Sequence, residues 1–160
     1  MASQLVDDVV KGFNTGIFAY GQSGGGKSYS LLGREGCLMD PEFQGIIPRA
    51  LDELFRRSSR RALERDQSSD PVVERVISLS MYELYLNEIY DLLLPEHSYQ
   101  PNPSGQGLAC AVKLEGREDR HLAKLTDQEV PDVESAIALL HRGTTRRRYS
   151  AMPLLSLIHI

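Results

Sequence analysis

A glycine-rich stretch is the part of this 160-residue sequence whose residue types and spacing could do chemistry. It reads Gly21-Gln22-Ser23-Gly24-Gly25-Gly26-Lys27-Ser28 and matches the pattern G-x-x-x-x-G-K-[ST] in full. Phosphate oxygens need several backbone N–H donors that converge without intruding side chains, and three consecutive glycines supply such a backbone. The pattern therefore predicts a phosphate-binding loop.

The two residues after the last glycine have separate expected roles. Lys27 would neutralise the β- and γ-phosphates of a nucleotide, and the Ser28 hydroxyl would take one position on Mg²⁺. The predicted nucleotide-binding residues are thus Gly21, Gln22, Ser23, Gly24, Gly25, Gly26, Lys27 and Ser28, with Ser28 also the metal ligand. The alternative is that the glycines only form a tight strand-to-helix turn, but the Lys-Ser pair has no purely structural purpose.

Three flanking elements must position this loop. The apolar run at residues 17–20 predicts a buried strand before it, and a short helix is expected to open at about Gly26 and to run through Leu31. Apolar residues at helical spacing predict an amphipathic helix over the first dozen residues, ending near Gly12. A strand before the loop and a helix after it is the context that a phosphate-binding loop requires.

The rest of the chain alternates between helical and strand patterns. Pro48 suits the first turn of a helix, and Asp132 suits the N-cap of another. The expected elements are a loop at 33–44, a helix at 46–55 fraying over 56–61, a surface connection at 58–71, a strand within 72–85, a helical turn or two at 87–94, a flexible loop at 96–107, two short strands within 108–125, and a helix from Val133 to about Gly143.

Composition narrows the class of protein. The chain is 41% hydrophobic and 25% charged, which is typical of one globular domain. A net charge of −4 argues against a general nucleic-acid binder, and no apolar stretch is long enough to span a membrane. Cys37 and Cys110 lie far apart, and the four histidines lack metal-ligand spacing, so no structural metal is expected. We expect a cytoplasmic protein.

The residues around the loop resemble one family. Residues 12–30 are similar to the kinesin motor signature G-Y-N-x-x-I-F-A-Y-G-Q-T-G-S-G-K-T-Y-T, and residues 80–93 resemble its S-x-x-E-I-Y-N-E-x-I-x-D-L-L stretch. Residues 45–50 resemble the second helix of the family, and residues 133–150 resemble the helix that leads to switch I. The resemblance covers residues 1–154 and implies an α/β P-loop NTPase fold, with part of a mixed β-sheet flanked by helices.

The departures from the family pattern are mild within the loop. Serine stands for threonine at positions 23, 28 and 30, and Gly25 stands for serine, which gives a looser loop. Larger segments of the pattern are not found in this sequence: the R-x-R-P strand expected upstream, switch I (N-x-x-S-S-R-S-H) and switch II (D-L-A-G-S-E). Without the switches no catalytic residue is identifiable, so hydrolysis by this chain alone is not expected.

The last six residues, 155–160, depart abruptly from the family pattern. Their sequence, L-S-L-I-H-I, is the translation of CTG-TCT-CTT-ATA-CAC-ATC, which resembles the end sequence of a transposon-based library adapter. We therefore expect two segments: a partial motor domain at 1–154 and a non-native tail at 155–160. The alternative is a natural hydrophobic C-terminus.

The resemblance implies the ATP-binding portion of a microtubule motor in the cytoplasm and cytoskeleton. Its ligands would be ATP and Mg²⁺, its partner in the full-length parent would be the microtubule, and neither nucleic acid nor membrane would be bound. Two alternatives remain. One is a different small P-loop kinase, for which Arg146, Arg147 and Arg148 are the only candidate lid arginines. The other is a non-catalytic or unstable fragment.

Overall fold

The structure is a computed structural model, and it describes residues 2–65, 76–85, 88–95, 111–112, 125–147 and 156–159. The chain forms two compact units. The first comprises Met1–Val76 with Asp132–Ile137, and the second comprises Ile77–Pro131 with Ala138–Ile160. Each unit is described by itself below.

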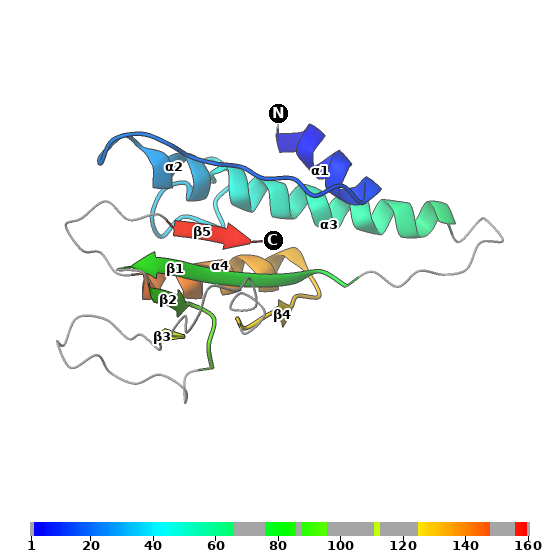
Figure 1. Ribbon diagram of the computed structural model, residues 1–160. Coiled ribbons are helices and arrows are strands. Elements are labelled where there is room, and N and C mark those ends of the chain that lie inside the picture. The colour runs from blue at the N-terminus through cyan, green and yellow to red at the C-terminus, as the bar shows by residue number, and fades with distance from the viewer. Residues whose placement is uncertain are drawn as a thin grey trace. The chain divides into compact units, whose positions relative to one another are not determined.

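In the first unit, helix α1 (Ala2–Lys11) lies beside helix α3 (Ile46–Arg65) (Figure 1). Helix α1 ends as predicted, because Gly12 has φ 100°, and its N–H donates to Val9 O at 2.9 Å. The side chains of Val6 and Leu51 are buried, with 6% and 1% of their surface exposed. The amphipathic pattern of the first dozen residues therefore turns an apolar face inward, as expected.

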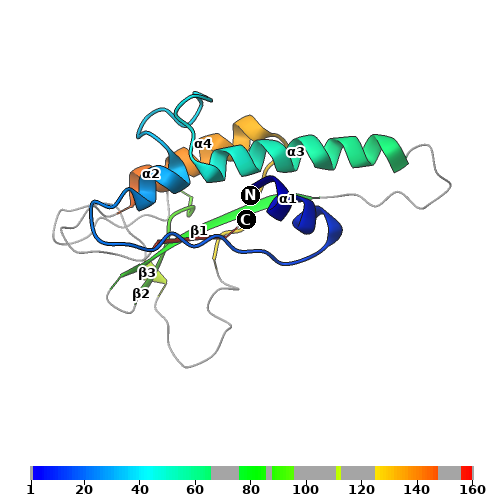
Figure 2. The same cartoon turned by 90° about the horizontal axis from the view of Figure 1, so that it is seen from above.

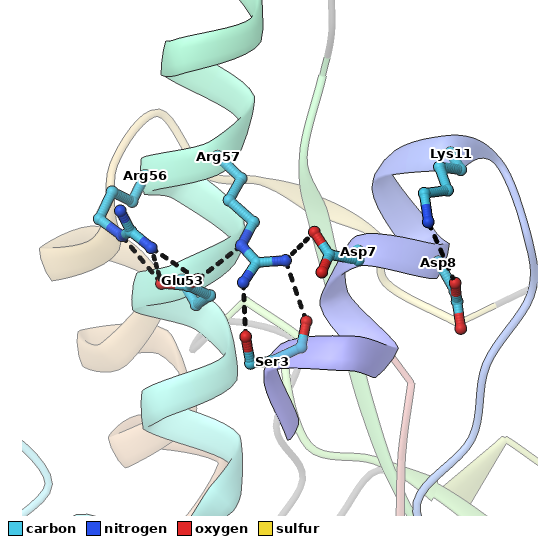
Figure 3. A network of polar contacts seen from close by, with 7 residues as sticks. All are labelled: Ser3, Asp7, Asp8, Lys11, Glu53, Arg56 and Arg57. Atoms are coloured by element: carbon cyan, nitrogen blue, oxygen red, sulfur yellow. Dashed lines mark hydrogen bonds and ion pairs between the residues drawn. The ribbon is translucent and has the colours of Figure 1, made fainter. Parts of the chain in front are cut away.

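A network of polar contacts links α1 to α3 (Figure 3). Arg57 forms an ion pair with Asp7 and donates to Ser3 O at 3.0 Å and to Ser3 Oγ at 2.5 Å. On its other side, Arg57 Nε donates to Glu53 Oε1 at 2.5 Å, and Arg56 also donates to this carboxylate. Hydrogen bonds from Arg56 and then Arg57 lower the pKa of Glu53, and Asp7 followed by Glu53 raises the pKa of Arg57.

Helix α2 (Lys27–Leu32) and helix α3 are joined by a loop that is closed at its base and projects away from both helices (Figure 2). Gly33 and Gln44 form an antiparallel bridge, Arg34 N donates to Phe43 O at 2.9 Å, and Gly45 N donates to Leu32 O at 3.1 Å. A Cβ on Gly33 would lie 2.0 Å from Phe43 O. Glycine is thus required here for the two backbone segments to approach each other.

The second unit is built around strand β1 (Ser78–Tyr85), which lies between β2 (Glu88–Asp91) and β5 (Ser156–His159) (Figure 1). β1 pairs antiparallel with β2 from Tyr82↔Asp91 to Tyr85↔Glu88, and with β5 from Ser80↔His159 to Glu83↔Ser156. Strand β4 (Gln128–Glu129) pairs with Ser78 and Leu79, and β3 (Ala111–Val112) pairs with β2. Every strand pair among the described residues is antiparallel.

Alternation along β1 creates the core of this unit. Leu79, Met81 and Glu83 are at most 1% exposed, while their neighbours Ser80 and Tyr82 are half-buried. Helix α4 (Val133–Arg146) lies on one side of β1, β2 and β3 (Figure 2). Gly143 of this helix is so close to β1 that an added Cβ would lie 2.3 Å from Met81 Sδ. The strand expected within residues 72–85 is therefore confirmed as β1.

Helix α4 begins at the predicted N-cap. Asp132 Oδ1 accepts a hydrogen bond from Ser135 N at 2.7 Å, and this bond lowers the pKa of Asp132. The helix continues past the expected end to Arg146, because two arginines of its last turns bind carbonyls that follow β2. Arg142 donates to Leu93 O at 3.3 Å, and Arg146 donates to Leu92 O at 3.1 Å and Leu94 O at 2.9 Å.

Three predicted elements differ in the structure. Residues 87–94 were expected to be helical, but Glu88–Asp91 is strand β2, because only residues 86 and 87 separate it from β1 and a hairpin is the shortest connection. Helix α3 extends to Arg65 instead of fraying from Arg56, since arginine, alanine and leucine favour helix and Glu53 pairs with both following arginines. The surface connection expected from residue 58 therefore starts later.

The strand predicted at residues 17–20 is also absent. These residues are extended, but they form no strand and are exposed, with Phe18 83% and Tyr20 101% accessible. A strand is made by hydrogen bonds to neighbouring strands, and no described strand lies against this run. The prediction of an extended conformation at residues 17–20 is thus confirmed, and the prediction that they form a buried strand is wrong.

Several expectations lie outside the described residues: the start of the 72–85 strand, the flexible loop at 96–107 and most of 108–125. In the part of the chain that the structure describes, no helix has the length and apolar character to cross a membrane. The same residues contain no cluster of His, Cys, Asp and Glu side chains that could hold a metal ion.

Candidate functional site: a glycine-rich phosphate loop

The octapeptide predicted from the sequence forms a turn that leads into α2. Gly25 N donates to Gln22 O at 3.1 Å, which closes the turn, and a Cβ on Gly25 would lie 3.0 Å from the same oxygen. Gly24 and Gly26 have φ angles of 76° and 77°, a region that side chains disfavour. Glycine therefore suits positions 24 and 26 because of their φ angles, and position 25 because of its closeness to Gln22 O.

The end of this turn presents backbone donors. Gly26 is the N-cap of α2, and the first hydrogen bond of that helix runs from Ser30 N to Gly26 O at 2.8 Å. The N–H groups of Lys27, Ser28 and Tyr29 precede that bond, so helix geometry leaves them without an intrahelical acceptor. Residues 21–26 and Ser28 are exposed to solvent. These donors are thus accessible to an anion.

The side chain of Lys27 folds back over the turn. Its Nζ donates to Gly21 O at 2.8 Å and to Gln22 O at 2.7 Å. An ammonium group has three donors, so two bonds to carbonyls fix its position and leave one hydrogen for another acceptor. The sequence pattern assigned Lys27 to phosphate but gave no indication of these two backbone acceptors, which only the closed turn brings together.

The donor set fits both expected ligands. Backbone N–H groups and one lysine match phosphate oxygens, and the exposed hydroxyl of Ser28, in the first turn of α2, is an oxygen ligand of the kind that Mg²⁺ accepts. The structure brings all eight predicted residues, 21–28, into this one turn and the start of its helix. Their ligands are inferred from this donor chemistry.

Two other charged side chains have structural surroundings. Arg146 belongs to the last turn of α4 and binds the carbonyls of Leu92 and Leu94, so it is not a free lid arginine. Glu83 is 1% exposed within β1, so its side chain lies in the core of the second unit. Arg148 lies outside the described residues.

Comparison with known proteins supports the resemblance found in the sequence. A sequence model of the kinesin motor domain matches residues 1–154. The kinesin heavy chain of Gibberella moniliformis is 31% identical over 146 residues, which are 91% of this chain and 14% of that protein. The kinesin heavy chain isoform 5C of Homo sapiens is 41% identical over 92 residues, which are 58% of this chain and 8% of that protein.

Solved structures give the same result for the fold. A fast kinesin, whose structure was analysed for its ATPase mechanism and interactions with microtubules, aligns with a TM-score of 0.60 and 28% identity over 89% of this chain and 35% of its own. The KIF14 dimer in complex with a microtubule and AMP-PNP aligns with a TM-score of 0.60 and 26% identity, over 92% and 36%. The chain thus spans about a third of these motor structures. Its sequence, its P-loop and its fold show that it belongs to the kinesin motor domain family.

Proposed function

We propose that this chain is the ATP-binding portion of a kinesin-like microtubule motor, which in the full-length parent couples ATP hydrolysis to microtubule-based movement. The observation that carries the proposal is the closed turn at residues 21–26, with Lys27 Nζ held by Gly21 O and Gln22 O beside free helix N–H groups. Support for the rest comes from the fast kinesin and from the microtubule-bound KIF14 dimer. A cytoplasmic, cytoskeleton-associated location follows from the same proposal.

Different residues of the loop bind different parts of Mg-ATP. Backbone N–H groups of Gly24 and of Gly26 to Ser28 donate to phosphate oxygens, while Gly25 N–H closes the turn on Gln22 O. Lys27 adds its positive charge and its third N–H. Ser28 supplies a hydroxyl to Mg²⁺, which when bound would neutralise phosphate charge. The sequence contains no match to the switch I and switch II patterns, so we propose nucleotide binding for this chain and hydrolysis for the full-length parent.

Calorimetric titration of the full chain with Mg-ATP tests the proposal. Wild type should bind saturably, and Lys27→Ala should abolish the heat. Lys11→Ala removes an exposed lysine of α1 outside the loop and should bind like wild type. Equal binding by both variants would contradict the proposed role of Lys27. A folded wild-type chain that binds no nucleotide would instead identify a non-catalytic fragment.

The metal ligand is tested separately with two variants at one position. Ser28→Ala should lose the Mg²⁺-dependent part of the affinity, whereas Ser28→Thr retains a hydroxyl and should bind Mg-ATP as wild type does. Both variants change an exposed side chain, so neither should unfold the chain. If ATP affinity responds to Mg²⁺ equally in Ser28→Ala and wild type, Ser28 is not the ligand.

We also propose that residues 1–154 are a partial motor domain and that residues 155–160 are a non-native tail. The pairing of β5 with β1 is compatible with this, because backbone hydrogen bonding along a strand can be made by any extended segment. Sequencing the transcript past the codon for Leu154 in libraries prepared without transposon adapters is the test. Recovery of the same six codons would show a genuine terminus.

A further inference from the structure

The second half of helix α3 is the most basic stretch among the described residues, and it lies outside the phosphate loop. Residues 56–61 read Arg-Arg-Ser-Ser-Arg-Arg, with four positive charges and no negative one, in a chain whose net charge is −4. Protein kinases select substrates by such charge patterns, and one class with an acidic substrate groove recognises Arg-Arg-x-Ser. The serine that completes this pattern in α3 is Ser59.

The structure separates Ser59 from the other candidate acceptors. Its neighbour Ser58 is half-buried, whereas Ser59 and the preceding Arg56 are exposed. The pattern Arg-Arg-x-Ser occurs once more in the sequence, at residues 147–150, where Ser150 lies outside the described residues. Of the two serines that complete the pattern, Ser59 is therefore the one whose exposure the structure shows.

The end of α3 is suited to local opening. Entry into a kinase groove requires an extended backbone, and Ser59 lies within the last two turns of the helix, which ends at Arg65. Figure 1 shows these turns continuing past α1. The buried side chains among the described residues of α3 all belong to its first turns, at residues 47, 48 and 51, and residues 56–60 have none. A helix end without buried side chains opens at a low cost in free energy.

One arginine of the pattern is held by α1 (Figure 3). Arg57 forms an ion pair with Asp7 and donates to Ser3 O at 3.0 Å. It also donates to Glu53 Oε1 at 2.5 Å, and only 18% of its side chain is exposed. A kinase that recognises Arg57 must first detach it from these partners. The contact between α1 and α3 therefore masks the pattern.

The other arginine of the pattern is placed to hold a phosphate. Arg56 precedes Ser59 by three residues, so the two lie on one face of the helix, and its guanidinium is 2.6 Å from Glu53 Oε2. A phosphoserine carries about −1.5 to −2 charges and accepts paired hydrogen bonds from arginine. A phosphate on Ser59 would thus compete with Glu53 for Arg56.

We propose that Ser59 is a phosphorylation site for a protein kinase that recognises two preceding arginines, and that the contact of Arg57 with α1 limits access to it. In the reaction, Ser59 Oγ bonds to the γ-phosphorus of ATP and the bond from that phosphorus to the β–γ bridging oxygen breaks. ADP leaves, and the hydroxyl proton passes to the catalytic carboxylate of the kinase. The kinase binds this ATP, so the proposal does not depend on the phosphate loop of the chain itself.

Treatment of the full chain with ATP and the catalytic subunit of cyclic-AMP-dependent protein kinase tests the site. Cleavage after glutamate gives the peptide 54–64, which separates Ser59 from Ser150, and mass spectrometry measures its phosphorylation. Wild type should carry one phosphate in this peptide. Ser59→Ala should lose it, and Ser58→Ala should retain it.

Two aspartates of α1 give a matched test of the masking. Asp7→Asn weakens the ion pair with Arg57 and should raise the initial rate of phosphorylation in peptide 54–64 by about two- to fivefold. Asp8→Asn instead weakens the ion pair with Lys11 and should leave the rate unchanged. Both carboxylates are partly exposed, with 52% and 40% of their side chains accessible, so neither variant should unfold the chain.

Three outcomes would overturn the proposal. A folded wild-type chain that takes up no phosphate in peptide 54–64 would exclude this site for the kinase class. Equal phosphorylation of that peptide in Ser59→Ala would identify Ser58 as the acceptor. Equal rates for wild type, Asp7→Asn and Asp8→Asn would show that the contact of Arg57 with α1 does not limit access.

Discussion

The exposed segment, residues 13–20, and strand β1 contain similar types of residue but have different surroundings. Both are extended and rich in aromatic and aliphatic side chains. β1 has partner strands on two edges and buries Leu79 and Met81, whereas residues 14–20 have no described hydrogen-bond partner and leave Phe18 83% exposed. β-propensity alone therefore gives an extended segment. Whether that segment becomes a buried strand depends on the presence of neighbouring strands.

The two regions also differ in what they contribute to the stability of the fold. Side chains of β1 contribute to folding because they leave water, at about 25 cal/mol for each Å² of apolar surface. Side chains of the exposed segment gain nothing from folding while they remain in water. Substitutions in the two regions should therefore affect different measurements.

The largest expected difference comes from truncating one side chain in each region. Met81→Ala in β1 removes a side chain with 0% exposure and should lower the free energy of unfolding by about 2–5 kcal/mol. Phe18→Ala in the exposed segment should change it by less than about 0.5 kcal/mol. Urea denaturation followed by circular dichroism measures both. Similar losses would mean that the exposed segment is buried in solution.

Backbone contacts should show a comparable contrast. Gly33→Ala places a Cβ 2.0 Å from Phe43 O at φ 98°, whereas Gly36→Ala has φ 75° and meets no atom within 4 Å. Both substitutions carry the cost of a left-handed conformation, but only Gly33→Ala also overpacks the loop base, for about 1–3 kcal/mol more. Thermal unfolding of the two variants gives the difference directly. Equal destabilisation would argue against the closed loop base.

Polar side chains should show the same difference between buried and exposed positions, and Asp91 is the buried example. Its Oδ1 accepts from Leu93 N at 2.8 Å and its Oδ2 from Thr126 N at 2.6 Å, and it is 1% exposed. Asp91→Ala leaves these donors unpaired and should cost about 1–3 kcal/mol, with a smaller loss for Asp91→Asn, which retains one acceptor. Asn14→Ala, in the exposed segment, is the matched control and should have no effect on the urea midpoint.

The smallest expected effect is the response of α4 to acid. The pKa of Asp132 is lowered in the folded state by the hydrogen bond from Ser135 N, so its stabilisation is present above its ordinary value near 3.8 and is lost as pH falls through the lower folded value. Asp132→Asn keeps the capping acceptor without titrating. Its melting temperature should therefore fall less between pH 5 and pH 2 than that of wild type. Parallel curves would exclude a titrating cap.

Local signals predicted the elements that depend on neighbouring residues. The N-cap at Asp132, the end of α1 at Gly12 and the start of α2 after Gly26 all follow from side-chain or glycine chemistry within one turn. The octapeptide at residues 21–28 is a prediction of the same kind, since its chemistry requires only a continuous stretch of chain.

Long-range partners account for what the sequence could not predict. Glu88–Asp91 was expected to be helical because its pattern is ambiguous over so few residues, and only pairing with β1 resolves it. The carbonyl partners of Arg142 and Arg146 lie about fifty residues away in sequence. Residues 17–20 are the opposite case. Their apolar pattern predicted a buried strand, but no partner strand lies against them in the described structure.

The closed base of the loop between α2 and α3 makes its tip a place for insertions. Gly33, Gln44 and Gly45 fix where the loop leaves and returns, and Met39 near the tip is 60% exposed. Lengthening a loop whose ends are already joined costs little, with roughly 0.6 kcal/mol for each doubling of its length. A fluorescent peptide tag could therefore be spliced between Met39 and Asp40 without altering the spacing of the two helices that follow the phosphate loop.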